Sequence, residues 1–305
     1  MHIAVLGVTG GIGDAVTTAA IRGGHTVTAL ARSPDRVEPR EGLRVIRGDV
    51  RDPSALAETL RGTDAVLHGV NVPYERWEPE MIELSDLIFA AAEAAGTTVL
   101  FPGNLYGLGP DFSEPLSEQS PRHPPAPKKG RLRNELEAKL NALSVPTITL
   151  RMGDFFGGIG ESTWMHFLTK DALQSAGAIQ YPSDPDVLHS WAYLPDAAEA
   201  FVRLAEKNTE LPTHASFHFE GHIVTGHTWI KAVRTALGDP NRRVKRLPWF
   251  WMQFARPFVP LVRELFEMRY LWDQPVRMDG SRLEQTVVLR HTPFEKAIVE
   301  ALSSS

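Results

Sequence analysis

The stretch HIAVLGVTGGIGDAV, residues 2–16, decides the fold of this chain. A short apolar run, residues 3–8, leads directly into Gly7, Gly10 and Gly13, and a segment with helical periodicity follows. The first glycine allows a tight turn, the second lets the backbone approach a pyrophosphate, and the third lets the helix pack against the strand. We therefore expect a turn built to hold the phosphates of a dinucleotide. The alternative is a glycine-rich turn that binds nothing.

The start of the expected helix supplies the chemistry for phosphate binding. The first turn of a helix has unpaired N–H groups and the positive end of the helix dipole, and both favour an anion. Thr9, Gly11 and Ile12 would offer backbone donors at this point. The expected phosphate-binding residues are therefore Gly7, Thr9, Gly10, Gly11, Ile12 and Gly13.

The end of the second expected strand indicates which cofactor binds. An acidic residue about 20 positions after the glycines suits the ribose 2′-hydroxyl of NAD, whereas an arginine suits the 2′-phosphate of NADP. Here Arg32 and Ser33 stand at that point, with no acid before Asp35. Because an arginine can form paired hydrogen bonds with a phosphate, we expect NADP rather than NAD. A solvated arginine that tolerates either cofactor is the alternative.

Short apolar strands alternate with helical segments through the first half of the chain. The expected strands cover residues 3–8, 26–30, 43–46, 65–67, 98–101 and 147–150, and the expected helices cover 12–22, 54–60, 80–95 and 128–143. This alternation predicts the α/β class, with a doubly wound parallel sheet, the Rossmann fold. We expect a dinucleotide-binding domain over residues 1–151 and a smaller mixed α/β substrate-binding region over 152–305 that partly rejoins the sheet.

Further candidate residues follow the expected strands, at the carboxyl edge where open α/β sheets bind their ligands. In chain order they are Asp49, Val50, His68, Gly69, Asn104, Tyr106, Gly153 and Phe155. The first four and the last two are expected to contact the cofactor. Asn104 and Tyr106 are candidate catalytic residues, although Tyr106 could instead be a packing residue with a satisfied hydroxyl.

The composition excludes several classes of function. With 43% hydrophobic residues, 23% charged residues and a net charge of −5, the chain has ordinary globular composition and no basic footprint for nucleic acid. No cysteine is present, which excludes disulfides and thiolate chemistry, and the histidines lack a metal-ligand spacing, so no metal is expected. Because an apolar strand begins almost at Met1, we expect no cleaved signal and a cytoplasmic protein without membrane contact.

Two apolar segments are candidate packing surfaces. Residues 247–254 read LPWFWMQF, and we expect them to form core or pocket wall rather than a peripheral membrane helix, which needs a more basic polar face. The helix over 128–143 carries a leucine stripe that packs either on the sheet or on a second copy of the chain, as in a homodimer.

The glycine turn and later motifs together resemble the extended short-chain dehydrogenase/reductase superfamily, and more narrowly its NAD-dependent epimerase/dehydratase group. The later motifs are GDV at 48–50, NLYG at 104–107, RMGDFFG at 151–157 and HSWAYLPD at 189–196. The resemblance covers about residues 1–240 and implies the fold and a nicotinamide cofactor, but no particular substrate.

The chain departs from the catalytic residues that the resemblance implies. Such proteins usually have a serine or threonine after the fifth strand and a Tyr-x-x-x-Lys pair on the next helix. Here Pro102 stands at the serine position, Lys129 where the tyrosine is expected and Arg133 where the lysine is expected. Lys129, with Arg133, could take over proton transfer if neighbouring cations lower its pKa. Alternatively, both bind the cofactor or an anionic substrate, or they lie on a solvated helix start.

Three functions follow from these patterns. The first is an atypical NAD(P)-dependent oxidoreductase that transfers hydride to or from a small carbonyl-type substrate, with Lys129, Arg133, Tyr106 and Asn104 as candidate catalytic residues. The second is a non-catalytic NADP-binding regulator or sensor. The third, a nucleotide-sugar epimerase or dehydratase, rests on the resemblance alone.

Overall fold

A seven-stranded parallel sheet forms the centre of the molecule. The computed structural model describes residues 1–110, 112, 114–121, 127–160, 163–174 and 177–303. The strand order is β10-β6-β5-β4-β1-β2-β3, and every neighbouring pair is parallel. The strands are β1 (His2–Leu6), β2 (Thr26–Ala31), β3 (Leu43–Arg47), β4 (Ala65–His68), β5 (Thr98–Asn104), β6 (Thr147–Met152) and β10 (His214–Phe219). This order confirms the predicted doubly wound sheet.

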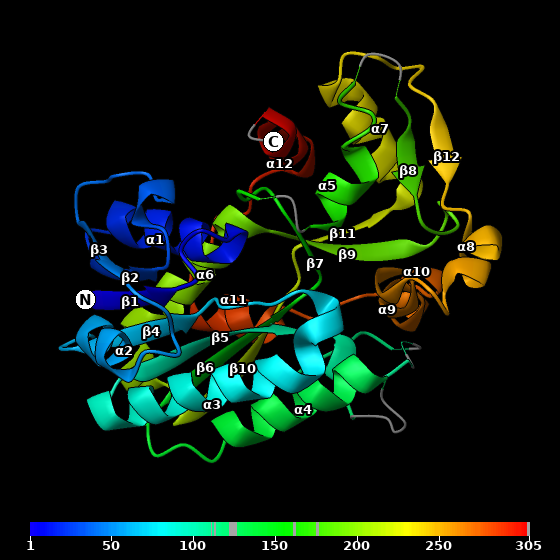
Figure 1. Cartoon of the computed structure of the whole chain (residues 1–305). Helices are drawn as coiled ribbons and strands as arrows, with labels where there is room; N and C mark the ends of the chain where they lie inside the picture. The colour runs from blue at the N-terminus through cyan, green and yellow to red at the C-terminus, as the bar shows by residue number, and fades with distance from the viewer. Residues whose placement is uncertain (111, 113, 122–126, 161–162, 175–176, 304–305) are drawn as a thin grey trace.

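Helices cover both faces of this sheet (Figure 1). Alternate residues of β1 point to opposite faces, so Ile3 and Val5 pack in one apolar layer while Ala4 and Leu6 pack in the other. The first layer includes α1 (Gly11–Arg22) and α6 (Leu194–Glu206), and the second includes α2 (Pro53–Leu60), α3 (Trp77–Ala95) and α4 (Lys128–Leu140). Burial on both faces explains why the strands read as almost continuous apolar runs.

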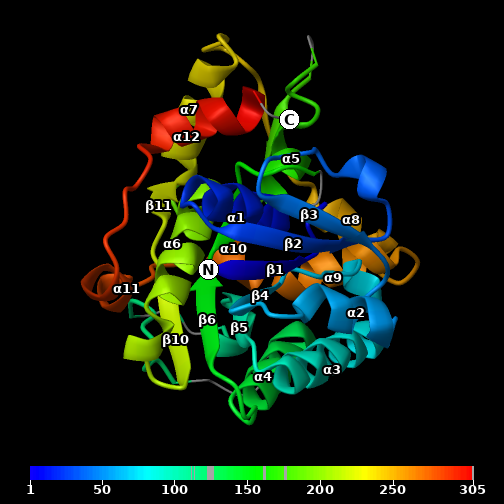
Figure 2. The same cartoon turned by 90° about the vertical axis from the view of Figure 1, so that its left-hand side faces the viewer.

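Residues beyond 151 contribute to the central sheet. β10 pairs with β6 in parallel, and Figure 2 shows it at the edge of the sheet next to β6. In the same way α6 packs alongside α1, although nearly 180 residues separate their contacts, such as the ion pair of Arg22 with Glu199 at 3.0 Å. Strand β10 and helix α6 therefore complete the sheet and one of its helical layers.

Most of the remaining elements pack beyond the carboxyl edge of the sheet (Figure 1), whereas α11 (Ser281–Thr286) packs against β10. They include a three-stranded sheet, β11-β9-β7, and a two-stranded sheet, β12-β8. Their bounds are β7 (Asp154–Phe156), α5 (Trp164–Thr169), β8 (Ile179–Tyr181), β9 (Leu188–Tyr193), β11 (His222–Thr225), α7 (Gly226–Ala236), β12 (Val244–Arg246), α8 (Trp249–Ala255), α9 (Pro260–Met268), α10 (Tyr270–Asp273), α11 (Ser281–Thr286) and α12 (Phe294–Ser303). Short 3₁₀ turns complete the chain: η1 (Pro34–Arg36), η2 (Tyr74–Arg76), η3 (Tyr106–Leu108) and η4 (Asn208–Glu210).

The two apolar segments singled out in the sequence differ in how far they are buried. Leu132, Leu136 and Leu140 of α4 are buried in the layer that α4 shares with α3, so the leucine stripe packs within the chain. Leu247 and Trp249 are buried and residues 247–251 line a second pocket, as expected, whereas Phe250, Trp251 and Phe254 are exposed rather than part of the core. Within the part of the chain that the structure describes, no helix has the length and hydropathy needed to cross a bilayer.

Candidate active site

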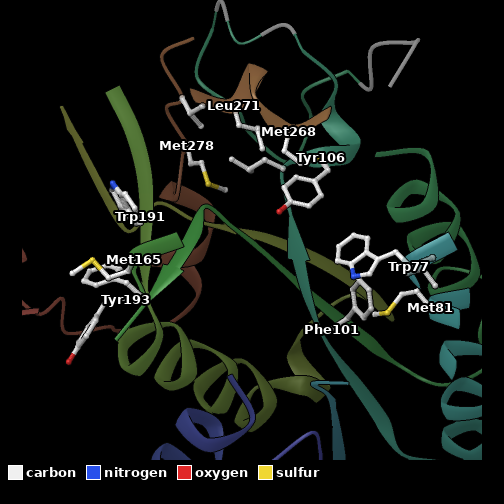
Figure 3. Packing of buried hydrophobic residues seen from close by; sticks show 14 of the residues in the cluster. Trp77, Met81, Phe101, Tyr106, Met165, Trp191, Tyr193, Met268, Leu271 and Met278 are labelled. Atoms are coloured by element: carbon white, nitrogen blue, oxygen red, sulfur yellow. The ribbon is translucent and has the colours of Figure 1, made fainter. Parts of the chain in front are cut away.

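A cavity of about 190 Å³ lies at the carboxyl edge of the central sheet. One end is formed by the turn before α1 and the other by segments after β4, β5 and β6, with β9 and residues 271–276 closing the far side. Its wall combines polar side chains with large apolar ones. The large apolar ones include Trp77, Met81, Phe101, Leu105, Trp164 and Leu271. Figure 3 shows Trp77, Met81 and Phe101 grouped on one side, with Leu271 on another.

The glycine turn has the geometry that a bound pyrophosphate requires. Gly7 has a φ of +90°, and a Cβ there would lie 2.4 Å from the carbonyl oxygen of Gly69. A Cβ at Gly13 would lie 2.2 Å from the carbonyl oxygen of Gly7, which is the close helix–strand packing expected of this position. Gly10 precedes α1 without a side-chain cap, and Gly11 lines the cavity. The first turn of α1 therefore offers uncapped backbone donors at the cavity, and these residues fit a dinucleotide cofactor.

The residues expected to contact the adenosine half lie beside this turn but outside the cavity. Arg32 is exposed directly after β2, and the described contacts engage its carbonyl oxygen, which Arg47 approaches at 3.4 Å, rather than its guanidinium. Asp35 is paired with Arg47 at 3.3 Å. After β3, the Asp49 carboxylate accepts a hydrogen bond from the backbone N–H of Arg51 at 2.9 Å, and Val50 packs against the core. Ser33 and Thr9 also lie at this edge of the sheet.

Two tyrosine hydroxyls meet in the wall of the cavity. The hydroxyl oxygens of Tyr74 and Tyr106 lie 3.0 Å apart, and both residues line the cavity. Asn104 fixes the backbone beneath them, because its Oδ1 accepts a hydrogen bond from the Tyr106 N–H at 3.1 Å. In Figure 3 the Tyr106 hydroxyl points away from Leu271, toward the space between the side chains drawn. Asn104 and Tyr106 were expected from the sequence, whereas Tyr74, which has no motif around it, was not.

Both tyrosines stay protonated at neutral pH. Burial, and then the neighbouring Tyr74 and Asp154, hold the pKa of Tyr106 well above its usual value, while Arg133 opposes the shift. Burial also raises the pKa of Tyr74, against its hydrogen bond with Tyr106. A protonated phenol donates a hydrogen bond, so this pair presents a donor to a ligand oxygen in the cavity.

Arg133 brings a buried positive charge to the same wall. Its guanidinium carbon lies 4.9 Å from the ring centre of Trp77 and 5.3 Å from that of Phe101, and Nη1 donates a long hydrogen bond to Pro102 O at 3.5 Å. Its Nε is buried without a hydrogen-bond partner among the described residues. Burial lowers the pKa of Arg133, while Tyr106 and other groups raise it. A buried cation with unused hydrogen-bonding capacity suits a ligand atom that carries negative charge.

The structure contradicts the roles expected of Lys129. Its side chain is almost completely buried and is absent from the cavity wall. The ammonium group forms ion pairs with Glu264 and, at 3.4 Å, with Glu267, both on α9. The backbone N–H of Lys129 also donates to Glu267 Oε1 at 2.7 Å. Lys129 therefore anchors α9 to the start of α4, and the local sequence could not reveal this because its partners come more than 130 residues later.

His189 and Asp154 form a further polar group in the cavity. His189 of β9 donates a hydrogen bond from Nε2 to Asp154 Oδ2 at 2.8 Å, and its ring stacks on Trp272 with 3.8 Å between centres. Both His189 and Asp154 line the cavity, and His189 Nδ1 is buried without a partner among the described residues. The RMGDFFG and HSWAYLPD segments contain these residues, so their motifs were the available signal.

All four remaining residues that were expected to contact the cofactor line the cavity. They are His68, Gly69, Gly153 and Phe155. The close approach at Gly153 is nevertheless to the chain itself, because a Cβ there would lie 2.2 Å from the carbonyl oxygen of Ser190. His68 donates from Nε2 to Ser85 Oγ at 2.9 Å, and burial lowers its pKa to about 4, so its ring is neutral.

Comparison with known proteins identifies the part of the chain that holds the glycine turn. Residues 7–142 match the family model described as NAD(P)H-binding. These residues form an NAD(P)H-binding domain of that family. The remainder of the chain lies outside that match. The expected resemblance is thus confirmed for the domain that carries the cofactor turn.

Solved structures extend the likeness to the whole chain at the level of the fold. UDP-glucose-4-epimerase from Stenotrophomonas maltophila, solved with bound NAD and formylated UDP-arabinopyranose, superimposes with a TM-score of 0.78 at 17% identity, over 99% of this chain and 96% of that one. A dTDP-glucose 4,6-dehydratase from Streptomyces venezuelae gives 0.76 at 17% identity, over 100% and 96%. The fold is therefore that of NAD-dependent epimerases and dehydratases.

One curated relative is more similar in sequence over a shorter stretch. The 2-alkyl-3-oxoalkanoate reductase of Stenotrophomonas maltophilia is 33% identical over 101 residues. The match spans 32% of this chain and 31% of the length of that protein. It therefore supports a shared portion of the two chains rather than a shared activity.

Proposed function

We propose that this protein is an NAD(P)-dependent oxidoreductase that transfers hydride to or from the carbonyl carbon of a small, mainly apolar substrate. The observation that carries the proposal is the Tyr74–Tyr106 hydroxyl pair, which lies in the same cavity as the uncapped start of α1. When bound, the nicotinamide cofactor supplies or accepts the hydride. What the chain must then provide is a proton, a charge that stabilises oxygen, and a dry cavity.

Tyr106 is the proposed proton donor. When a carbonyl is reduced, hydride goes to carbon and a proton must go to oxygen, so a protonated phenol directed into the cavity meets the requirement. Tyr106 would give its proton to the substrate oxygen and regain one from Tyr74, whose hydroxyl is 3.0 Å away. Tyr74 would in turn regain its proton from solvent before the next turnover. In the direction of oxidation the same protons would move the opposite way.

Arg133 is the proposed electrostatic partner of this step. Its buried guanidinium is the cation whose charge opposes the raised pKa of Tyr106 and of Tyr74. The same charge would stabilise negative charge that develops on the substrate oxygen or on the phenol. Arg133 stands where the resemblance expects a lysine, so a cation would be retained at that position. The phenol would come from Tyr106 in η3 instead of from a tyrosine on α4.

The lining of the cavity favours a carbonyl compound with alkyl substituents. Trp77, Met81 and Leu271 offer an apolar part of the wall against which alkyl groups would pack. The name of the curated relative, 2-alkyl-3-oxoalkanoate reductase, agrees with this class. The Asp154–His189 pair supplies one polar end that could orient such a substrate.

NADP is the proposed cofactor, with NAD as the alternative. Arg32 stands exposed at the end of β2, and the nearest acid, Asp35, is already paired with Arg47. An arginine without a neighbouring free carboxylate suits a 2′-phosphate better than a ribose hydroxyl.

The test is turnover of purified protein with NADPH or NADH and a panel of aldehydes, ketones, 3-oxo esters and enones. We expect substrate-dependent loss of nicotinamide absorbance, and we expect Tyr106→Phe to lower kcat/KM about a hundredfold or more without changing cofactor affinity. Tyr181→Phe is the matched control, because Tyr181 is a buried tyrosine outside the cavity wall.

The other outcomes of this experiment identify the alternatives. Tight NADPH binding without turnover of any substrate would contradict the proposal and favour a cofactor-binding regulator. Conversion of UDP-sugars or dTDP-sugars without net change in the cofactor would contradict it in favour of an epimerase or dehydratase. Full activity of Tyr106→Phe would overturn the assigned proton donor.

A further inference from the structure

The segment from α8 to the start of α9 exposes several large apolar side chains that are close together in the sequence. We call this group the aromatic patch, and its members are Phe250, Trp251, Phe254, Phe258, Val259 and Leu261. Phe258 is 83% exposed and Trp251 is 71% exposed. Soluble proteins rarely leave so many neighbouring apolar side chains in water unless the surface has a partner.

The exposure follows from the way in which the segment is anchored. Trp249 is the one residue of α8 that is buried, and its indole N–H donates to the carbonyl oxygen of Pro182. Its ring also contacts Phe266 of α9, with 5.1 Å between ring centres. With Trp249 directed inward, Phe250 and Trp251 point to the other side, where their rings lie 5.3 Å apart. The burial of Trp249 therefore determines that Phe250 and Trp251 are exposed.

The charge around the patch differs from that of the chain as a whole. Residues 241–263 contain six arginines and lysines and no aspartate or glutamate, whereas the chain has a net charge of −5. Lys245 is exposed before α8, Arg256 follows α8, and Arg263 lies on α9. Arg242, Arg246 and Arg263 form ion pairs with Asp239, Asp184 and Glu264. Lys245 and Arg256 therefore supply the positive charge that flanks the exposed aromatic side chains in the sequence.

We propose that the aromatic patch docks on the surface of an anionic lipid bilayer. Tryptophan and phenylalanine are favoured at the boundary between headgroups and acyl chains, and flanking arginines and lysines are attracted to anionic headgroups. This proposal replaces the sequence-based expectation of no membrane contact. That expectation treated residues 247–254 as core or pocket wall, because the segment itself lacks a basic polar face.

A second copy of the chain is a poorer occupant for electrostatic reasons. A twofold dimer brings the same surface of each copy together, so the positive segment 241–263 of one copy would face the same segment of the other. Such like charges repel, whereas a bilayer with anionic lipid offers both an apolar phase and the opposite charge.

The experiment uses the full chain and vesicles of phosphatidylcholine, either alone or mixed with phosphatidylglycerol. Trp251 reports directly on docking, because Trp77, Trp191, Trp229, Trp249 and Trp272 are buried and Trp164 is half-buried. We expect co-sedimentation with the anionic vesicles, reduced by salt, and quenching of Trp251 fluorescence by brominated lipid. We expect the double variant Trp251→Ser, Phe258→Ser to bind the anionic vesicles at least about tenfold more weakly than the unaltered chain.

Val288→Ser with Val299→Ser is the matched control, since both valines are exposed outside the patch. This variant should bind vesicles like the unaltered chain. Absence of binding to anionic vesicles, or equal binding by the patch variant, would overturn the proposal. A third contrary outcome is a dimer of the unaltered chain in sedimentation velocity, absent from the patch variant, together with no binding to vesicles. The patch would then be covered by a second copy of the chain. Circular dichroism checks that both variants are folded.

Discussion

The ammonium group of Lys129 is buried in an ion pair with the carboxylate of Glu264, and this contact joins the start of α4 to α9. Lys129 stands where the family resemblance expects a catalytic tyrosine, yet its side chain is held away from the cavity wall. Its place beside Tyr74, with Nζ 5.3 Å from the ring centre, makes it a support for the residues that do line the cavity. The proposed chemistry therefore belongs to Tyr106 and Arg133.

Lys129→Met should destabilise the fold more than it impairs the chemistry. Removing the lysine leaves Glu264 buried, with Arg263 as its remaining partner at 3.3 Å, and breaking a buried ion pair costs about 3–5 kcal/mol. Denaturant unfolding measures this loss. The double variant Lys129→Met, Glu264→Leu should recover much of it, because no charge is then stranded. Unchanged stability with lost turnover would instead return Lys129 to a direct role in proton transfer.

Arg133→Leu should lower turnover with little effect on cofactor affinity. Removing the buried cation withdraws stabilisation of negative charge at the cavity, for which losses of about a hundredfold in kcat are usual. Steady-state kinetics and NADPH titration measure the two effects separately. Lys128→Ala is the control, because Lys128 lies on the same helix start and pairs with Glu78 at 2.5 Å on the surface. An equal loss in both variants would contradict the assignment.

Arg32→Ala should weaken NADPH binding about tenfold to a hundredfold and leave NADH binding almost unchanged. The reason is the loss of a charge-assisted hydrogen bond to the 2′-phosphate, which NADH lacks. Calorimetric titration with each cofactor measures both values. Arg36→Ala, on the adjacent exposed turn η1, serves as the control. If both cofactors lose the same affinity, the preference for NADP is contradicted.

His68 should make the stability of the protein fall in mild acid. Burial first, and then the charge of Arg133, lower its pKa from 6.5 to about 4. Below pH 6.5 the unfolded chain therefore binds a proton on His68 that the folded chain does not bind. The contribution of neutral His68 to the free energy of unfolding is complete above pH 6.5 and is lost as the pH falls through about 4, a change of about 3 kcal/mol.

His68→Gln isolates this effect. The difference in unfolding free energy between pH 7 and pH 4 should be smaller in His68→Gln than in the unaltered chain by about 3 kcal/mol. Urea unfolding at several pH values measures it. His2→Gln is the control, because His2 lies near the surface, where its Nδ1 contacts Gly62 O at 3.3 Å. An identical pH dependence in all three proteins would show that His68 does not carry the effect.

The sequence determined the central sheet and the phosphate turn because both depend on local patterns. Apolar runs buried on both faces, alternating with helices, specify parallel strands, and Gly7 and Gly13 are required wherever a strand packs this closely against a helix. The positions of Asn104 and Tyr106 followed as well, since the end of a strand in such a sheet always lies at the ligand-binding edge.

Only the tertiary structure decided which side chains meet in the cavity. Tyr74 reaches Tyr106, His189 reaches Asp154, and Lys129 is taken by Glu264, and each pair joins segments at least 32 residues apart. No local pattern encodes such pairings, because they depend on how whole elements pack. The same holds for the aromatic patch, where burial of Trp249 against the fold determines that Trp251 faces water.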